Sequence, residues 1–279
     1  MRWLEYDLPP LRAGAIAIAT VLLENAGDVA WDSRAGTGIC IGYHWLDRLG
    51  NPVVWDGLLS AFPEVVSPGE RVEVFISIAG PIPAGDYRIA LDLVDGGRCW
   101  FEEVGNTRLE LDVPVLARLD GRALGVVLSG GDSELAAITH EALQRQKETL
   151  DDCSEITAFL PAGALPPPDW STKVLDAHAE GYGAVGGSIG VRGSRFTRRK
   201  ERAELEPWRT AKGRQPGWSR PLLCPSLHRD VVQRVRWLEP VAGLPAVSPP
   251  DFPDRWLWDG TISLEIDARA LRRDDRRSA

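Results

Sequence analysis

Five side chains in the first part of the chain belong to the types that bind sugars. They are two indoles, one imidazole and two carboxylates, namely Trp31, His44, Asp47, Trp55 and Asp56. An indole ring can stack on the apolar C–H face of a sugar, while imidazole and carboxylate groups form hydrogen bonds with the hydroxyls at its edge. We therefore take these five residues as the candidate ligand-binding set for a saccharide. The chain holds 11 Trp against four Tyr and six Phe, more than an ordinary core requires.

The same stretch also permits a structural interpretation. Tyr43 and Trp45 share a strand face with two isoleucines, so we expect them in the core. His44 falls on the opposite face, where a lone histidine is commonly a plain sheet-surface residue. Trp55 precedes a turn at Asp56, and both a ligand platform and a packing role remain open for it.

The second part of the chain offers one candidate catalytic side chain. The carboxylate of Asp259 could take the proton of an acceptor hydroxyl and so act as a general base, provided that a sugar donor is bound. The four cysteines occur singly, with neither zinc-site nor disulfide-framework spacing. The sequence therefore predicts no metal site and no resident cofactor.

Short alternating runs make up the chain up to residue 116. Val72, Val74, Ile76 and Ile78 place four β-branched side chains on one strand face, and polar residues occupy the other. Turn residues separate several runs of this kind, and no helical period occurs among them. Six to eight strands at this spacing predict an all-β immunoglobulin-like sandwich over residues 1–116.

The period changes in residues 117–279. An apolar run at 123–128 leads through a glycine loop into a helical pattern that ends near Lys147, with Asp132 or Ser133 as its N-cap. A second strand at 156–160, a helix at 169–180 and a strand at 184–189 follow. This order predicts an α/β domain with parallel strand pairing.

Six blocks in the first domain resemble a β-sandwich module that accompanies bacterial sugar transferases of surface-polysaccharide pathways. The blocks lie at residues 24–31, 41–47, 56–57, 67–70, 85–94 and 100–101. This resemblance implies that the module binds a saccharide or a lipid-linked glycan. It also implies a partner such as a glycosyltransferase or a polysaccharide exporter.

The second domain resembles the centre of family 2 glycosyltransferases of the GT-A fold. The likeness lies in the apolar strand, Pro-rich turn and Trp-led helix of residues 159–170, and in the Gly-Gly strand at 183–187. Residues 222–232 resemble a stretch in which those enzymes present an Arg before a helix. Residues 258–264 lie where the family has an acidic motif and a following helix.

One departure from that family concerns catalysis. Active members hold a divalent cation with an Asp-x-Asp motif, which here is replaced by Pro161-Ala162-Gly163. The region before this motif is also short for a nucleotide pocket. We therefore expect a degenerate, truncated GT-A-like domain without activity. The alternatives are an active transferase that uses a nucleotide sugar with Mn²⁺ or Mg²⁺, and a pure interaction module for a partner transferase.

Charge and hydropathy exclude some classes of protein. Residues 1–116 hold eight Arg and no Lys against 17 acidic residues, a balance unsuited to nucleic acid. The basic run from Arg192 to Arg202 is expected to be a solvated loop, and residues 272–279 a frayed tail. The sequence contains no stretch of 18 apolar residues, so it predicts no membrane span. Acidic residues near Met1 argue against a signal peptide, so a cytoplasmic location is expected.

Overall fold

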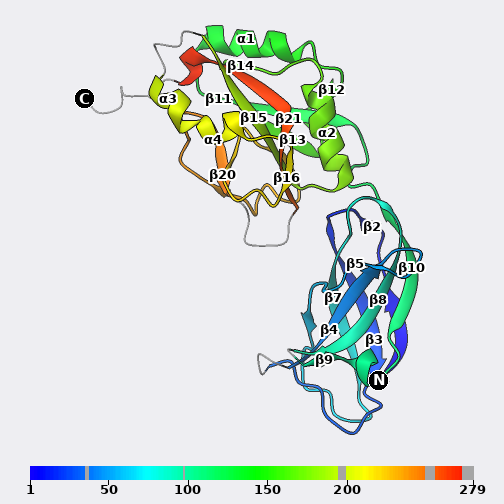
Figure 1. Cartoon of the computed structure of the whole chain (residues 1–279). Coiled ribbons are helices and arrows are strands. Elements are labelled where there is room, and N and C mark those ends of the chain that lie inside the picture. Colours follow the sequence, from blue (N-terminus) through cyan, green and yellow to red (C-terminus); the bar gives the residue numbers. More distant parts are fainter. Residues whose placement is uncertain (35–37, 97, 194–198, 249–254, 272–279) are drawn as a thin grey trace. The chain divides into compact units, whose positions relative to one another are not determined.

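The computed structural model describes residues 1–34, 38–96, 98–193, 199–248 and 255–271. Strands account for 45% of the chain and helices for 16%, so the predicted β-rich character is confirmed. The chain divides into two compact units, Met1–Arg118 and Leu119–Ala279 (Figure 1). The predicted tail at 272–279 and residues 194–198 of the basic run lie outside the described residues. Residues 199–202 of that run belong to the helix α3 (Arg199–Glu204) instead of the expected loop.

Three strands form the first sheet of Met1–Arg118. The strands β1 (Arg2–Asp7) and β7 (Arg71–Ala79) both pair antiparallel with the central strand β3 (Ile16–Glu24). Along β7, every second residue from Val72 to Ile78 is buried, because successive side chains of a strand point to opposite faces. The alternation predicted for this strand is confirmed.

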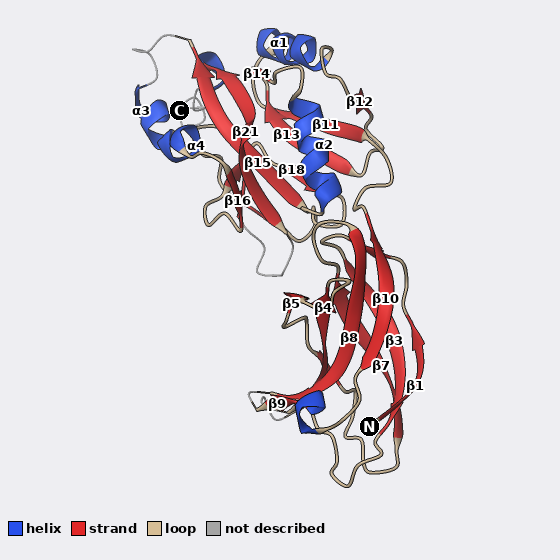
Figure 2. Cartoon of the chain, turned by 45° about the vertical axis from the view of Figure 1, so that its right-hand side comes forward, coloured by secondary structure: helices blue, strands red, loops and turns tan. Residues whose placement is uncertain are grey.

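The second sheet of this unit has the order β2–β10–β8–β4–β5. Its strands are β2 (Leu11–Arg12), β10 (Leu109–Leu116), β8 (Gly85–Asp95), β4 (Ile39–Leu46) and β5 (Pro52–Val54). Two short strands extend it, since β6 (Ser60–Ala61) pairs with β4 and β9 (Cys99–Trp100) pairs with β8. The short 3₁₀ helix η1 (Phe101–Val104) follows β9, and Figure 2 shows it in blue beside β9 in a unit otherwise drawn as strands and loops.

One hydrophobic core lies between these two sheets. Tyr43 and Trp45 of β4 are buried in it together with alternate residues of β7 and β8. Their polar atoms are satisfied at the backbone of Ala79, whose N–H donates to Tyr43 Oη at 2.8 Å and whose carbonyl accepts from Trp45 Nε1 at 2.9 Å. The predicted core role of these two aromatic residues is confirmed.

A mixed sheet of eight strands forms the centre of Leu119–Ala279. Its order is β12–β11–β13–β18–β15–β21–β14, with β16 paired to β21. The strands are β11 (Ala123–Ser129), β12 (Thr149–Leu150), β13 (Ile156–Pro161), β14 (Ala164–Leu165), β15 (Ala184–Arg192), β16 (Arg214–Pro216), β18 (Ser226–His228) and β21 (Trp256–Asp267). A separate small antiparallel sheet contains β17 (Leu222–Leu223), β20 (Ala246–Ser248) and β19 (Arg236–Trp237).

The described helices of this unit are short. They are α1 (Ser133–Leu143), α2 (Trp170–Glu180), α3 (Arg199–Glu204), α4 (Glu206–Thr210) and the 3₁₀ helix η2 (Ala268–Leu271). Asp132 caps α1 as predicted, because its carboxylate accepts the N–H of Leu135 at 2.9 Å. This helix ends at Leu143, earlier than expected. The helix predicted at 169–180 corresponds to α2.

Three predictions for the second unit are wrong. The strands β11 and β13 are parallel as expected, but β18 runs antiparallel between β13 and β15, so the sheet is mixed. Residues 256–267 form the strand β21 where the resemblance placed an acidic motif and a helix. Ile262, Leu264 and Ile266 are buried there and alternate with exposed neighbours, which is the period of a strand. Turns, with no helix, follow Arg229.

Candidate functional site

The outer face of the second sheet carries a cluster of aromatic and polar side chains. His44 lies on this face because its neighbours Tyr43 and Trp45 point into the core. Gly42 and Asp92 are directly opposite each other in the register of β4 and β8, and so share the face with His44. A Cβ atom at Gly42 would lie 2.6 Å from the ring of Trp100, so glycine is what lets this indole rest on the strand.

His44 is enclosed between two indoles and has no exposed surface. Its ring is stacked on Trp55, with centroids 4.1 Å apart and an angle of 20° between the planes. The ring of Trp100 lies at the same centroid distance and is tilted by 57°. His44 Nδ1 also contacts the backbone carbonyl oxygen of Trp55. His44 therefore contacts Trp55 twice, at the indole ring and at the backbone carbonyl.

Trp55 combines this support with exposure. The residue is 44% exposed although one face of its ring is stacked on the imidazole of His44. A ligand can therefore stack only on the other ring face. The turn that follows Trp55 is fixed to β4, because the N–H of Gly57 donates to the carbonyl of Tyr43 at 2.9 Å. An indole held in this way can stack on an apolar ligand face.

A surface hollow adjoins Trp55 on the same side of the unit. It is lined by Asp56, Gly57, Leu59, Val94, Asp95, Gly96, Arg98, Cys99, Trp100 and Glu103. Arg98 Nη1 pairs with Asp95 Oδ2 at 3.1 Å, and Glu103 accepts the N–H of Trp100 at 3.2 Å. Asp56 is exposed at the edge of the hollow. The hollow supplies several hydrogen-bonding groups, and its aromatic lining residue is Trp100, whereas Trp55 lies next to Asp56 outside the lining.

Asp92 is buried beneath this site and was not among the predicted binding residues. Its two carboxylate oxygens accept the N–H groups of Leu93 and Glu102, each at 2.8 Å. Burial raises the pKa of Asp92, and the two backbone N–H donors partly oppose that rise. The alternation of β8 places Asp92 on the outer face, but the short helix that covers it carries no clear sequence signal.

The structure corrects three of the predicted ligand-binding residues. Trp31 is 4% exposed within the core, where its ring is stacked on Phe62 at 5.4 Å, so it has no face for a ligand. Asp47 shapes the turn after β4, because it accepts the N–H groups of Leu49 and Asn51, each at 2.8 Å. The Asn51 hydrogen bonds lower the pKa of Asp47. His44 is enclosed too, so it cannot touch a ligand directly. Trp55 and Asp56 are exposed side by side.

Asp259 does not have the surroundings of a general base. It is 6% exposed, and Oδ1 accepts both the N–H and the hydroxyl of Thr261 at 2.8 Å. Its Oδ2 pairs with Arg214 Nε at 3.2 Å, across the β16–β21 register. A base needs a free oxygen within reach of the hydroxyl that it deprotonates. Instead, Asp259 stabilises a turn through Thr261 and forms an ion pair with Arg214.

Pro161-Ala162-Gly163 does not fit a site for a cation and a nucleotide sugar. None of the three side chains carries a ligand atom, and Ala162 is buried. The N–H of Gly163 is used by Leu135 O and Thr139 Oγ1 of α1, at 3.1 and 2.8 Å, and its carbonyl accepts the N–H of Asp267. Nowhere in the described ranges do three His, Cys, Asp or Glu side chains gather to hold a metal ion.

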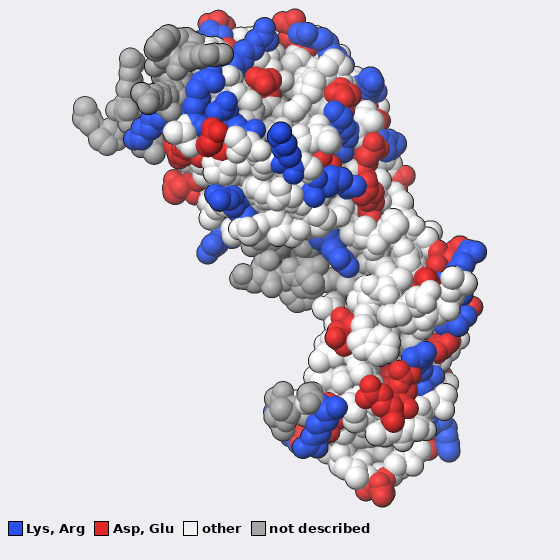
Figure 3. All heavy atoms as spheres, in the orientation of Figure 1, with Lys and Arg blue, Asp and Glu red and all other residues white. Residues whose placement is uncertain are grey.

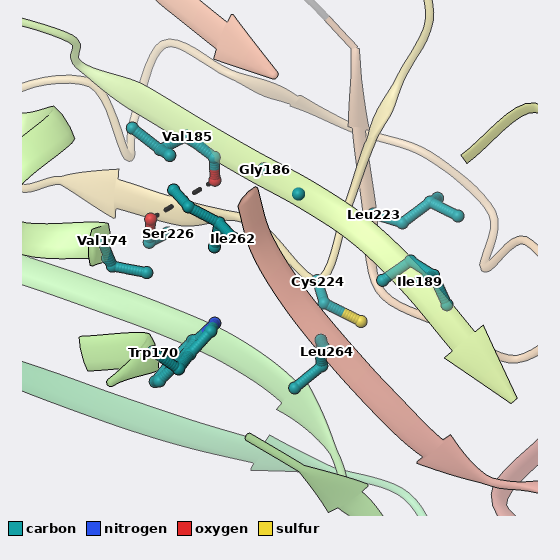
Figure 4. Close-up of a pocket in the computed structure, with 11 residues that line it drawn as sticks. Trp170, Val174, Val185, Gly186, Ile189, Leu223, Cys224, Ser226, Ile262 and Leu264 are labelled. Carbon is teal, nitrogen blue, oxygen red and sulfur yellow. Dashed lines mark hydrogen bonds between the residues drawn. The ribbon is translucent and has the colours of Figure 1, made fainter. Parts of the chain in front are cut away.

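A small pocket lies elsewhere in the second unit (Figure 4). Residues of α2, β15, β17, β18 and β21 line it together with Cys224, and most are apolar. The cavity has room for about one water molecule, so it excludes a sugar ring. Ser226 Oγ lies 3.0 Å from His178 Nε2 and 3.3 Å from the carbonyl of Val185. Because His178 and Ser226 are both buried, this pair is sealed from substrates. Burial also raises the pKa of the Cys224 thiol, which favours its unreactive form.

Basic and acidic side chains both occur on the face of the second unit seen in Figure 3. Arg214 pairs with Glu180 and Asp259, and Arg122 with Glu148 and Asp176. The prediction that the chain does not bind nucleic acid stays a prediction. None of the helices in the described ranges is both long and apolar enough to cross a membrane.

Comparisons with known proteins give little further guidance. No family model matches the chain, and no curated protein matches it. A search of solved structures returns one described as a "putative beta-galactosidase from bacteroides fragilis", with 10% identity and a TM-score of 0.21. The match covers 74% of this chain and 31% of that one, so this chain spans about a third of its length. A likeness at this level carries no argument about function.

Proposed function

We propose that the chain is a carbohydrate-binding or scaffolding protein of bacterial surface-polysaccharide assembly. In this proposal Met1–Arg118 is an immunoglobulin-like sandwich that binds a saccharide or lipid-linked glycan. The observation that carries the proposal is Trp55, a 44% exposed indole whose inner face is stacked on a buried imidazole. Asp56 and the adjoining hollow supply hydrogen-bonding groups beside it.

The second unit is proposed as a degenerate transferase-like domain without catalytic activity. The engaged carboxylate of Asp259 and the absence of ligand atoms at Pro161-Ala162-Gly163 support this view. Its partner would be a glycosyltransferase or an exporter of the same pathway. A cytoplasmic location remains part of the proposal.

The test is a glycan-array screen followed by calorimetric titration of the glycans that bind. Trp55→Ala is expected to weaken binding at least about tenfold, because the stacking surface is lost. Trp55→Phe keeps a ring and should retain more affinity. Trp237→Ala is the matched control, since Trp237 is also 44% exposed but lies in the second unit. Equal affinities for the Trp55→Ala variant and the unaltered chain would refute the site.

A protein-interaction module is a second candidate, and one observation favours it. Ile18 and Phe75 are 57% and 67% exposed on neighbouring strands of the three-stranded sheet. Exposed apolar side chains on adjacent strands can mark an interaction surface. An array that shows no saccharide binding at all would move the assignment to this candidate.

A further inference from the structure

The contact between His44 and Trp55 fixes the tautomer of the imidazole. A backbone carbonyl oxygen can only accept a hydrogen bond, so His44 Nδ1 must carry the hydrogen that it directs at Trp55 O. In the neutral ring, Nε2 is then the nitrogen without hydrogen. This Nε2 is buried and has no hydrogen-bond partner among the described residues. The polar contact of His44 is therefore directed at Trp55.

The imidazole is also held firmly in place. The ring lies 4.1 Å from Trp55 on one side and 4.1 Å from Trp100 on another, and no part of it is exposed. Trp100 is itself anchored, because its N–H donates to Glu103 and it belongs to a strand paired with β8. Trp55 is thus stacked on an imidazole that a second indole, Trp100, holds against the sheet.

We propose that His44 is a positioning residue that holds the indole of Trp55 in one orientation for a saccharide. This inference rests on the proposed function and concerns how the same site is ordered. Its two contacts act on one residue, since the stack fixes the ring and the hydrogen bond fixes the backbone that carries it. A side chain that is ordered beforehand loses less conformational freedom when the ligand binds.

The first test needs no saccharide. The full chain is labelled with 5-fluorotryptophan, and the ¹⁹F signal of Trp55 is assigned by its loss in Trp55→Phe. His44→Asn can place an N–H near the position of Nδ1, whereas His44→Gln places its amide nearer to Nε2. We expect the Trp55 signal to broaden or shift in His44→Gln and to be partly restored in His44→Asn. The signal of Trp45, which is buried in the core, serves as the folding control.

The outcomes separate this inference from the proposed function. An unchanged Trp55 signal in His44→Gln, with an unchanged Trp45 signal, would overturn the positioning role even if saccharide binds. Where the array supplies a glycan, His44→Gln should bind it about 2- to 10-fold more weakly, the loss that corresponds to ordering one side chain on binding. A chain that binds no glycan but shows the spectral change would refute the function and retain the role of His44.

Discussion

Asp92 is a carboxyl group that the fold keeps beneath an exposed aromatic site. Two backbone N–H groups satisfy its oxygens, yet burial raises its pKa above the ordinary value of 3.8. The folded state therefore favours the protonated form more than the unfolded state does. Its contribution to stability is full below pH 3.8 and is lost as the pH rises through the folded pKa.

Asp92→Asn makes this linkage measurable. The variant cannot ionise at this position, so it does not lose this contribution as the pH rises. The unfolding free energy of the unaltered chain minus that of Asp92→Asn should therefore fall from pH 4 to pH 7. Urea unfolding at the two pH values gives this difference. A difference that is constant or grows with pH would contradict the raised pKa.

The residue types that form the site could be predicted from the sequence, but the exposure of each side chain could not. Trp55 and Asp56 were predicted beside a turn, and they are exposed there. Trp31 and His44 were predicted to bind ligand and are buried, because Phe62, Trp55 and Trp100 cover them from loops and short strands. Such coverage depends on contacts between distant segments, which local alternation does not encode.

The strand β21 illustrates a constraint at the scale of an element. Its register with β15 shifts after Gly187, which pairs with Asp259, whereas Ser188 pairs with Ser263. The intervening residues bulge toward β15, and a Cβ atom at Gly187 would lie 1.8 Å from the carbonyl oxygen of Ile262. Only a residue without a side chain permits this approach.

Gly187→Ala should therefore lower the free energy of unfolding by about 1–3 kcal/mol or more, as expected for overpacking. Gly121→Ala is the control, since no atom lies within 4 Å of its Cβ position, and it should change stability by less than about 0.5 kcal/mol. Denaturant unfolding of both variants provides the comparison. Equal stabilities would show that the strands can separate at the bulge without cost.

Periodicity predicted the long elements better than the short ones. Four alternate β-branched residues identified β7, and helical spacing identified α1. The strand β18 has only three residues, all of them buried, so neither its existence nor its direction shows in the pattern. For β21, the alternation of Ile262, Leu264 and Ile266 was present in the sequence, but the resemblance to a transferase favoured a helix.

For the whole molecule, the change of charge and period near residue 116 falls close to the division between Arg118 and Leu119. The nature of the second unit is the larger question. The backbone of Gly163 forms hydrogen bonds with α1 and with Asp267, and Pro161-Ala162-Gly163 has no side-chain atom that could bind a cation. We therefore expect no donor chemistry from this unit.

Calorimetric titration with UDP- and GDP-sugars, with and without Mn²⁺, tests that expectation. We expect no metal-dependent heat of binding, because a diphosphate needs a cation or clustered basic groups to offset its charge. Clear binding that requires Mn²⁺ would refute the proposal of an inactive domain and favour the active-transferase alternative.

The 3₁₀ helix η2 has a practical consequence for handling the protein. Leu271 is fully buried, and Arg269 ties this helix to Asp267 and to Glu134 of α1. A chain cut by a protease ahead of Ala268 would lose these contacts together and expose apolar surface at the end of the sheet. Clipping during purification should then show as precipitation of the shortened product, and intact mass is the quality criterion to follow.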